Sequence, residues 1–239
     1  MKLWANVCFH YVEKRVKHFY KLIENLKFVD AKFIINSNIN FDNTLPIDVA
    51  ILSNPYYLTW EHKKYMQKFL DSDYTHFAYL EGNVEITKKN LDYWESTKEI
   101  FEKNNLNFIP GLHRVQIVDG QTYSLDCTRQ VSKIPSLELE GKKFISLPEP
   151  YQGMFIMDKQ MVKEHIQSEY FIIGQKGWWG IRESANLGNT FVNVPNGFNH
   201  RVLVSLDNFE DTLIPHFGTN YHSDPMSPHA KIKIENLFV

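Results

Sequence analysis

The sequence predicts an α/β fold in which a mostly parallel β-sheet is flanked by helices, the Rossmann-like class. Short apolar runs alternate with amphipathic stretches over residues 1–110, which is typical of parallel strands joined by helices. The apolar run Phe77–Leu80 ends abruptly in the polar triplet Glu81–Asn83, as a buried strand does at the carboxyl edge of a sheet. Residues 111–239 contain turn residues and stretches of alternating apolar and polar residues, which predict a second half of mixed strands and helices.

The elements of the first half follow from the spacing of its apolar residues. Five apolar residues recur at helical spacing within Glu13–Leu26 and predict a helix there. Thr59 is expected to cap a helix over Trp60–Leu70, with Glu61 in its first turn, where the helix dipole favours a carboxylate. The other expected elements are a helix over Asn90–Asn104 and strands at Leu3–Phe9, Ala31–Asn36, Ile47–Ser53 and His76–Leu80.

The second half reads as shorter and more varied elements. A strand is expected at Leu112–Val118, and the segment Gln121–Leu147 predicts antiparallel strands or a flap. A strand at Gly153–Met157 precedes helices over Asp158–Gln167 and Trp178–Leu187. The proline-rich final part is expected to be mostly irregular. Because no repeat or linker interrupts the chain, we expect one domain over residues 1–239.

Composition limits the class of partner and the cellular compartment that we expect for this protein. A net charge of -2 and a pI of about 6.6 argue against nucleic acid as the main partner. Cys8 and Cys127 form neither a metal pair nor a disulfide framework, so we expect a reducing, cytoplasmic setting. No signal-peptide pattern and no apolar run of the roughly 18 residues of a membrane span occur. Lys-rich helices such as Val12–Phe28 leave peripheral membrane association open.

The familiar catalytic signatures are missing. The chain has no Walker loop, no G-x-G-x-x-G after the first strand, no G-x-S-x-G elbow and no H-E-x-x-H. Polar residues that follow predicted strands are the remaining candidates. The first of these is the triplet Glu81–Asn83, whose oxygen ligands suit a hard divalent cation or sugar hydroxyls beside a diphosphate, while a tight turn is the alternative.

Two more candidate groups lie at predicted strand ends. His10-Tyr11 and Asn36–Asn38 follow neighbouring strands, where asparagine side chains can read a base edge and Tyr11 can stack on a base. Ordinary turn chemistry explains Asn36–Asn38 equally well. The stretch Glu149–Gly153 includes Gln152 and ends in Gly153, which would let a ligand or another strand approach the backbone.

The last two groups combine aromatic and titratable residues. Gly177–Glu183 places two tryptophans between glycines, which suits stacking on a sugar ring, and ends in a carboxylate able to take a proton from a hydroxyl. An aromatic plug with a surface pair of Arg182 and Glu183 is the alternative. His216, near Asn220–His222, could bind a cation or phosphate, although isolated histidines are more often structural.

Together these motifs resemble the GT-A glycosyltransferases, and in particular a family-two-like group from bacteria and large viruses. That group has a strand ending YLEDD, a PYQGM strand, a WGIRE helix and an NNY-like element in a proline-rich tail. This chain has YLEGN at Tyr79–Asn83, PYQGM at Pro150–Met154, WGIRE at Trp179–Glu183 and TNY at Thr219–Tyr221. The likeness covers residues 74–238, and the earlier part fits only in its strand–helix order.

The resemblance implies a function and a set of site residues. Residues 1–110 would bind a nucleotide-sugar donor and residues 111–239 a glycan or glycoconjugate acceptor, with Glu183 as general base of an inverting transfer. A Mn²⁺ or Mg²⁺ ion would be held by Glu81, Asn83 and His216. The residues implied in binding the donor and its diphosphate are His10, Asn36, Glu81, Asn83, Arg114, Gln152, Gly153, Trp179, Arg182 and His216, with Arg201 as a further candidate.

One departure from the pattern leaves the function open. Gly82 and Asn83 replace both aspartates of the group's motif, and a neutral amide binds a dication less strongly than a carboxylate does. The metal would then be bound weakly, or the enzyme would work without it. A non-catalytic carbohydrate- or nucleotide-sugar-binding module is the main alternative. A nucleotidyltransferase ranks last, because Val7–Lys17 has no glycine.

Overall fold

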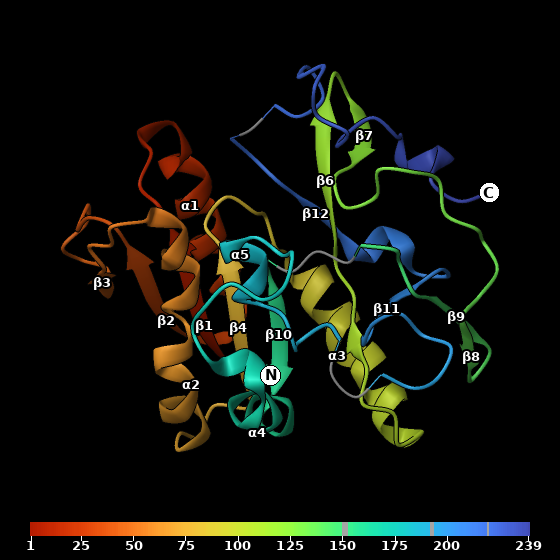
Figure 1. The fold of residues 1–239 in the computed structure, drawn as a ribbon, viewed down its shortest axis with the longest axis horizontal. Coiled ribbons are helices and arrows are strands. Elements are labelled where there is room, and N and C mark those ends of the chain that lie inside the picture. Colours follow the sequence, from red (N-terminus) through yellow and green to blue (C-terminus); the bar gives the residue numbers. More distant parts are fainter. Residues whose placement is uncertain (150–152, 192–193, 219) are drawn as a thin grey trace. The chain divides into compact units, whose positions relative to one another are not determined.

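The computed structural model describes all residues except 150–152, 192–193 and 219 (Figure 1). The chain forms two compact units. Unit 1 comprises Met1–Asn83 and Gln152–Asn189, and unit 2 comprises Val84–Tyr151 and Thr190–Val239. Both units contain helices and sheets with parallel strand pairs, so the expectation of a mixed α/β protein is confirmed.

Unit 1 is built on a five-stranded sheet in the order β10-β4-β1-β2-β3. Four of its strands run parallel and β10 is antiparallel to β4. The strands are β1 (Lys2–Phe9), β2 (Asp30–Ser37), β3 (Ile47–Val49), β4 (His76–Glu81) and β10 (Phe155–Asp158). Phe77, Ala78, Tyr79 and Leu80 of β4 are all 0% exposed, as expected for a strand covered on both faces.

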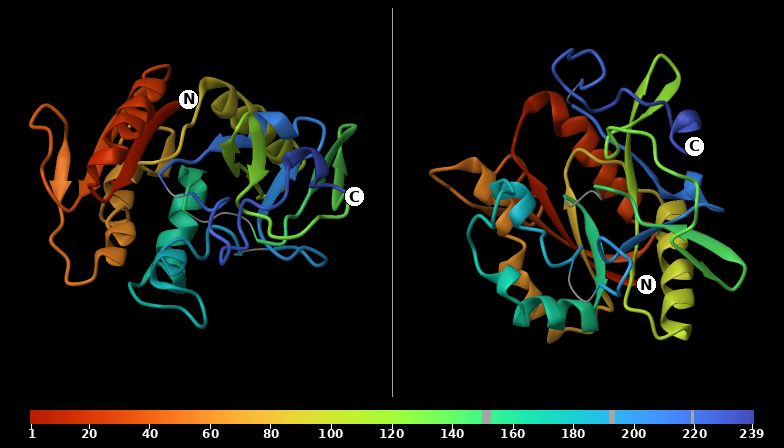
Figure 2. Two further views of the ribbon diagram at one scale, coloured as in Figure 1. Left: turned by 90° about the horizontal axis from the view of Figure 1, so that it is seen from above. Right: turned by 45° about the vertical axis from the view of Figure 1, so that its right-hand side comes forward.

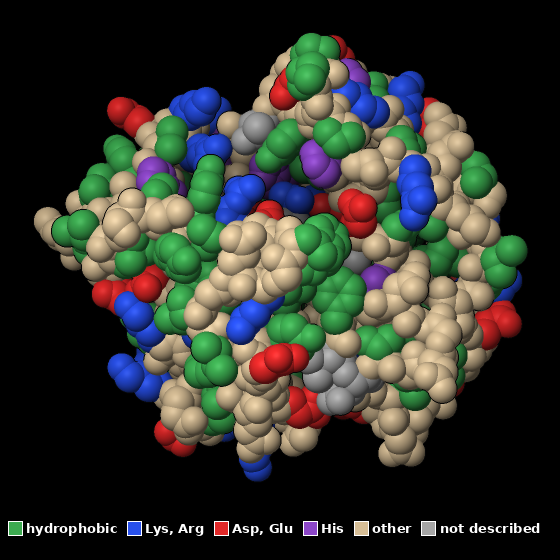
Figure 3. All heavy atoms as spheres, viewed as in Figure 1, with side chains coloured by type: hydrophobic (Ala, Val, Ile, Leu, Met, Phe, Trp, Pro, Cys, Tyr) green, Lys and Arg blue, Asp and Glu red, His purple; other side chains and the backbone are tan. Residues whose placement is uncertain are grey.

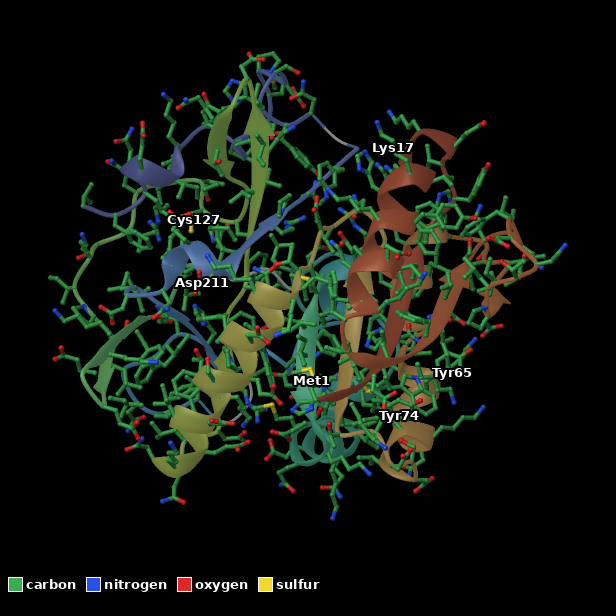
Figure 4. All side chains as sticks on the ribbon, turned by 180° about the vertical axis from the view of Figure 1, so that it is seen from behind. Met1, Lys17, Tyr65, Tyr74, Cys127 and Asp211 are labelled. Atoms are coloured by element: carbon green, nitrogen blue, oxygen red, sulfur yellow. The ribbon has the colours of Figure 1, made fainter. Side chains whose placement is uncertain are left out.

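Helices cover the two faces of this sheet (Figures 1, 2 and 4). Helix α1 (Glu13–Leu26) has the predicted bounds and stacks Phe19 on Phe9 of β1, with ring centroids 4.7 Å apart. The opposite face carries α2 (Lys63–Leu70), whose Phe69 packs edge-on against Trp4. Helix α4 (Lys159–Gln167) packs beside α2, and Asp158 caps it by accepting from the backbone N–H of Met161.

The expected cap at Thr59 is wrong. Asn54 accepts from the N–H of Tyr56, and Pro55 follows it, so a 3₁₀ helix, η1 (Pro55–Trp60), forms before α2. The Thr59 hydroxyl donates to the carbonyl of Tyr56 inside η1, and α2 begins after His62. Local turn chemistry at Asn54 therefore overrides the capping signal.

The helix expected over Trp178–Leu187 is also mostly wrong. Only α5 (Ile181–Ser184) is helical, preceded by the short η2 (Glu169–Phe171). Gly177 has a φ of +56°, in the left-handed region, and Gly180 is extended. The two glycines thus keep the tryptophans between them outside the helix.

Unit 2 contains two small mixed sheets and one long helix. The first sheet has the order β5-β11-β9-β8, formed by β5 (Ile109–Pro110), β11 (Val202–Ser205), β9 (Lys142–Ile145) and β8 (Leu137–Leu139). The second has the order β12-β6-β7, formed by β12 (Leu213–Pro215), β6 (His113–Val118) and β7 (Gln121–Ser124). The remaining elements are α3 (Lys88–Lys103), η3 (Phe209–Thr212) and η4 (Ile234–Asn236).

The final part of the chain is more ordered than expected. β11 pairs in parallel with β5, and β12 pairs in parallel with β6. The antiparallel pairing expected within Gln121–Leu147 is confirmed by β8 with β9, while β7 pairs with β6. Across the part of the chain that the structure describes, we find no helix with the length and apolarity of a membrane span.

Candidate functional site

Four polar residues form a row at the carboxyl ends of the parallel strands of unit 1. The strand register aligns Asp48 of β3 with Asn36 of β2, Asn36 with Cys8 of β1, and Cys8 with Glu81 of β4. Since paired residues of neighbouring strands point to the same face, the four side chains lie on the face that carries η1 and α2. We call this row and the residues packed on it the edge site.

Glu81 occupies a special position in this sheet. β2 and β3 lie on one side of β1, and β4 lies on the other. The strand order therefore reverses between β1 and β4, where Cys8 and Glu81 are paired. Open α/β sheets bind their ligands outside the carboxyl ends of the strands at such a switch point.

The β2 and β3 end of the row forms a buried floor. Asn36 is 0% exposed, and its Nδ2 donates to Oδ1 of Asn6 at 2.5 Å. Asp48 accepts from the hydroxyl of Tyr65 on α2, and burial, followed by this hydrogen bond, raises the pKa of Tyr65. Asn36, expected to bind the donor, is thus engaged beneath the surface.

The pKa of the Cys8 thiol is shifted by burial and by charged side chains. Burial, followed by the charge of Glu81, raises the pKa of the Cys8 thiol to about 12. The charge of Glu61 raises it further and that of Arg182 lowers it. At neutral pH the thiol is protonated, which argues against a cysteine nucleophile here.

Glu61 lies between η1 and α2, on the face of the sheet that carries the edge site, and sequence reasoning gave it no role there. It follows η1, its residue is 7% exposed, and its Oε2 accepts from Nζ of Lys64. From the sequence, the only role expected of Glu61 is that of a carboxylate in the first turn of a helix, where the helix dipole favours it. An acidic residue directly after the apolar Leu58–Trp60 stretch is the sign that could have found it.

The glycine of the triplet Glu81–Asn83 has a packing role. A Cβ on Gly82 would lie 2.6 Å from Cδ2 of Phe9 and 3.0 Å from its Cβ. The N–H of Gly82 donates to the carbonyl of Cys8 at 2.9 Å, so the backbone after β4 lies tightly against β1. Glu81 and Asn83, on either side, are partly buried.

The short helix α5 of unit 1 carries two charged side chains, those of Arg182 and Glu183. Nε1 of Trp60 in η1 donates to the carbonyl of Ile181 at 3.0 Å, and the N–H of Lys176 donates to Oγ of Ser184 at 3.0 Å. On the helix anchored in this way, the Arg182 guanidinium lies over the Tyr56 ring at 5.3 Å. An Nη of Arg182 is 3.7 Å from Oε1 of Glu183, and their side chains are 54% and 42% exposed.

The two tryptophans before α5 form a stacked pair. Their ring centroids are 4.1 Å apart and their planes are inclined by 23°. Trp178 is 82% exposed, whereas Trp179 is partly buried. An aromatic plug would bury both rings. The exposure of Trp178 therefore favours the stacking surface expected from the sequence over the plug.

The other predicted site residues lie in different settings. His10 is exposed after β1, Gly153 is partly buried before β10, and Gln152 lies outside the described residues. Arg114 and His216 belong to unit 2. Arg114 donates through Nε to Asp126, and His216 is 6% exposed and forms a β-bridge with Val84.

The residues present fit a divalent cation poorly. Glu81 is the one carboxylate of its triplet, and a side chain at position 82 would point at Phe9 on the face that carries α1, away from Glu81. Among the described residues, no group of three or more His, Cys, Asp or Glu side chains gathers as a metal site. The face in Figure 3 shows Lys and Arg interspersed with Asp and Glu.

Comparison with known proteins gives little guidance. No protein-family model and no curated protein match the chain. Among solved structures it is similar to a glycosyltransferase involved in the glycosylation of the major capsid of PBCV-1, at 10% identity and a TM-score of 0.39, over 92% of this chain and 95% of that chain. These values are too low to show a shared fold or activity.

Proposed function

We propose that this chain is a GT-A type glycosyltransferase that transfers a sugar from a nucleotide-sugar donor to a hydroxyl of a glycan or glycoconjugate. One observation carries the proposal: Glu81 lies at the switch point of a parallel sheet, and α5, which carries Arg182 and Glu183, is tied by a hydrogen bond to η1 on the same face of that sheet. The strand order of unit 1 suits the Rossmann-like half that the sequence resemblance implies.

Each accessible group of unit 1 has a role in this proposal. Glu81 and Asn83 would orient the donor sugar and diphosphate, and Trp179 with Arg182 would line the pocket. Glu183 would take the proton of the acceptor hydroxyl as its oxygen attacks the anomeric carbon. The bond from that carbon to the diphosphate oxygen breaks, and the nucleoside diphosphate leaves with the electron pair. The partial exposure of Glu183 supports its access to an acceptor.

Replacing Glu183 by Gln tests this assignment. We expect Glu183→Gln to reduce turnover by about 10²- to 10⁴-fold, because a general base is lost, and to leave donor binding unchanged. Turnover is measured as nucleoside diphosphate released from the donor that a thermal-shift screen selects. Glu169→Gln, at an exposed residue of η2, is the matched control. Unchanged turnover in the Glu183 variant would sink the assignment.

A second function is favoured by one observation. Gly82 and Asn83 stand where the resembling group has two aspartates, which is what a binding module with a degenerate site would show. Such a module would bind a nucleotide sugar and neither transfer nor hydrolyse it. The turnover measurement with the wild-type chain separates the two functions.

A further inference from the structure

Helix α1 and its flanking residues carry a concentrated positive charge. Residues 12–28 contain five basic and two acidic side chains, a net charge of +3. The whole chain has a net charge of -2, so the rest of it carries a net charge of -5. Charge of one sign gathered on one helix of an otherwise acidic chain points to a partner of the opposite sign.

Three of the lysines form a stripe on the solvent side of α1. Lys14, Lys17 and Lys21 are exposed and follow one another at spacings of three and four residues. At about 100° per residue, they point within about 60° of one another around the helix axis. The buried Phe19 and Leu22 point to roughly the opposite side. We call Lys14, Lys17 and Lys21 the basic stripe, of which Lys17 is labelled in Figure 4.

The acids of α1 leave this charge unbalanced. Glu13 lies in the first turn, where it faces the partial positive charge of the helix N-terminus. Glu24 accepts from Nζ of Lys27, a lysine outside the stripe, at 2.7 Å. By contrast, α3 has four basic and four acidic residues, and its Lys88 pairs with Asp92 one turn along at 2.6 Å. A charged face that serves only to be solvated has its balance on α3 and not on α1.

An exposed aromatic ring continues the line of the stripe. Phe28 is 63% exposed. The backbone of Lys27 before it is still in the right-handed helical region, and the N–H of Phe28 donates to the carbonyl of Asn25 at 3.5 Å. Position 28 therefore lies on the same side as Lys21, two turns earlier. Lysines that attract an anionic surface and an aromatic ring that enters it are two usual contributions to membrane binding.

We propose that α1 binds the surface of a membrane that contains anionic lipids, through the basic stripe and Phe28. The three lysines span about 10 Å along a straight helix, which fits the flat array of charges on a bilayer. An apolar ring beside them favours a bilayer over nucleic acid, because the ring can enter the headgroup region. Since the apolar side of α1 packs into unit 1, the helix would lie on the membrane by its polar side.

Binding through α1 would leave the edge site uncovered. Phe19 of α1 stacks on Phe9 at one face of the sheet, whereas η1 and α2 cover the other face. The membrane would then contact unit 1 on the side away from η1. The inference does not rest on the proposed function, because binding to a membrane needs neither a donor nor a transfer.

Sedimentation with lipid vesicles tests the inference. The wild-type chain is mixed with vesicles of phosphatidylcholine alone and with vesicles that also contain phosphatidylserine. We expect binding only to the second kind, and weaker binding as the salt concentration rises. The variant with Lys14→Glu, Lys17→Glu and Lys21→Glu should bind about tenfold more weakly or less, since each lysine near an anionic surface contributes about 1 kcal/mol. Phe28→Ala should have a smaller effect, about threefold.

Two matched variants separate the stripe from net charge. Lys68→Glu, Lys103→Glu and Lys163→Glu together give the same net charge at exposed lysines of three other helices, and should leave binding unchanged. Arginine at the three stripe positions keeps the charge and should also bind as wild type does. Circular dichroism checks that the variants fold.

Four outcomes would overturn the inference. They are equal loss of binding in the two glutamate variants, equal binding to both kinds of vesicle, no binding of the wild-type chain to vesicles, and binding to a short DNA duplex in place of vesicles through the same lysines. None of these results bears on the release of nucleoside diphosphate from a donor, so the proposed function stands or falls by its own measurement.

Discussion

Two polar clusters of this molecule look alike in sequence and differ in structure. In unit 1, Glu81 at the end of β4 and the pair Arg182 and Glu183 on α5 have side chains that are partly or half exposed. In unit 2 a charged residue of β6, Arg114, has a partner in Asp126, and the pair is 16% and 2% exposed. Both clusters contain charged residues within or just after strands. What separates them is how completely their hydrogen-bonding groups are satisfied inside the fold.

In unit 2 the carboxylate of Asp126 is satisfied from within the fold, while Nδ1 of the nearby His113 is buried without a hydrogen-bond partner. The two oxygens of Asp126 accept from the backbone N–H of Arg114 at 2.6 Å and from its Nε at 3.0 Å. Beside them, Nε2 of His113 is 2.9 Å from Oγ of Ser124, which also accepts from the N–H of Cys127. Burial lowers the pKa of His113, which keeps the ring neutral. Such a cluster holds β6, β7 and the following loop together.

The largest effect is expected from Asp126→Ala. It leaves the Arg114 side chain, only 16% exposed, without its carboxylate. Removing one partner of a buried pair typically costs about 3–5 kcal/mol, so we expect a loss of that order in the free energy of unfolding by urea. Glu138→Ala, at an exposed residue of β8, should stay within about 0.5 kcal/mol of wild type. Equal stability of the two variants would remove the distinction drawn between the clusters.

Gly82→Ala tests the packing between β1 and the backbone after β4, with a smaller expected effect. The added methyl group would press on Phe9, and overpacking of this kind typically costs about 1–3 kcal/mol. At Gly180 the same change would meet only the carboxylate end of Glu183, a flexible group, so Gly180→Ala should cost less than Gly82→Ala, about 1 kcal/mol or below for the change at a helix N-cap. Urea unfolding of both variants measures the contrast. If Gly82→Ala were as stable as wild type, Phe9 would be free to move out of the way of the added methyl group.

Much of the framework of unit 1 could be predicted because its signals are local. The apolar spacing of Glu13–Leu26 gives the helix bounds, and the apolar run before Glu81 gives β4. The pairing of β11 and β12 could not be predicted, because each finds its parallel partner far away in the sequence. Short strands with distant partners carry no periodic signal of their own.

The candidate site was only partly predictable for a related reason. The sequence marks Glu81 and Arg182 through motifs, but it cannot say which polar residues the fold satisfies internally. Asn36 turns out to be paired with Asn6, and Glu61 lies between η1 and α2 because η1 replaces the expected helix start. Whether a polar residue serves structure or ligand is therefore decided by partners that only the tertiary fold supplies.

Lys63 is a buried titratable residue of unit 1. Its Nζ donates to the carbonyl of Tyr170 at 2.6 Å and lies 4.2 Å from the centre of the Trp60 ring. Burial, followed by the charge of Lys176, lowers the pKa of Lys63 to about 7 from the ordinary 10.5. Between these two values the unfolded chain binds a proton here that the folded chain does not. Stability should therefore be lowest below pH 7 and rise as the pH increases through this window.

The variant Lys63→Met isolates this contribution. The difference in unfolding free energy between wild type and Lys63→Met should shift in favour of wild type by up to about 1.4 kcal/mol for each pH unit above the folded-state pKa. Urea unfolding over this window measures the difference, and Lys68→Met, at an exposed residue of α2, is the control. A difference independent of pH would show that Lys63 is charged in the folded chain at neutral pH.

The smallest effect on stability is expected at Glu81 itself. Because Glu81 is partly exposed, Glu81→Gln should change the free energy of unfolding by less than about 0.5 kcal/mol. Its charge nevertheless raises the pKa of Cys8, so the variant should alkylate Cys8 with iodoacetamide at lower pH than wild type does. Cys8→Ser identifies the reacting thiol, since Cys127 is 2% exposed. An unchanged pH profile would place the Glu81 carboxylate away from the Cys8 thiol, whereas a shift to lower pH at constant stability would place it beside that thiol, at the switch point.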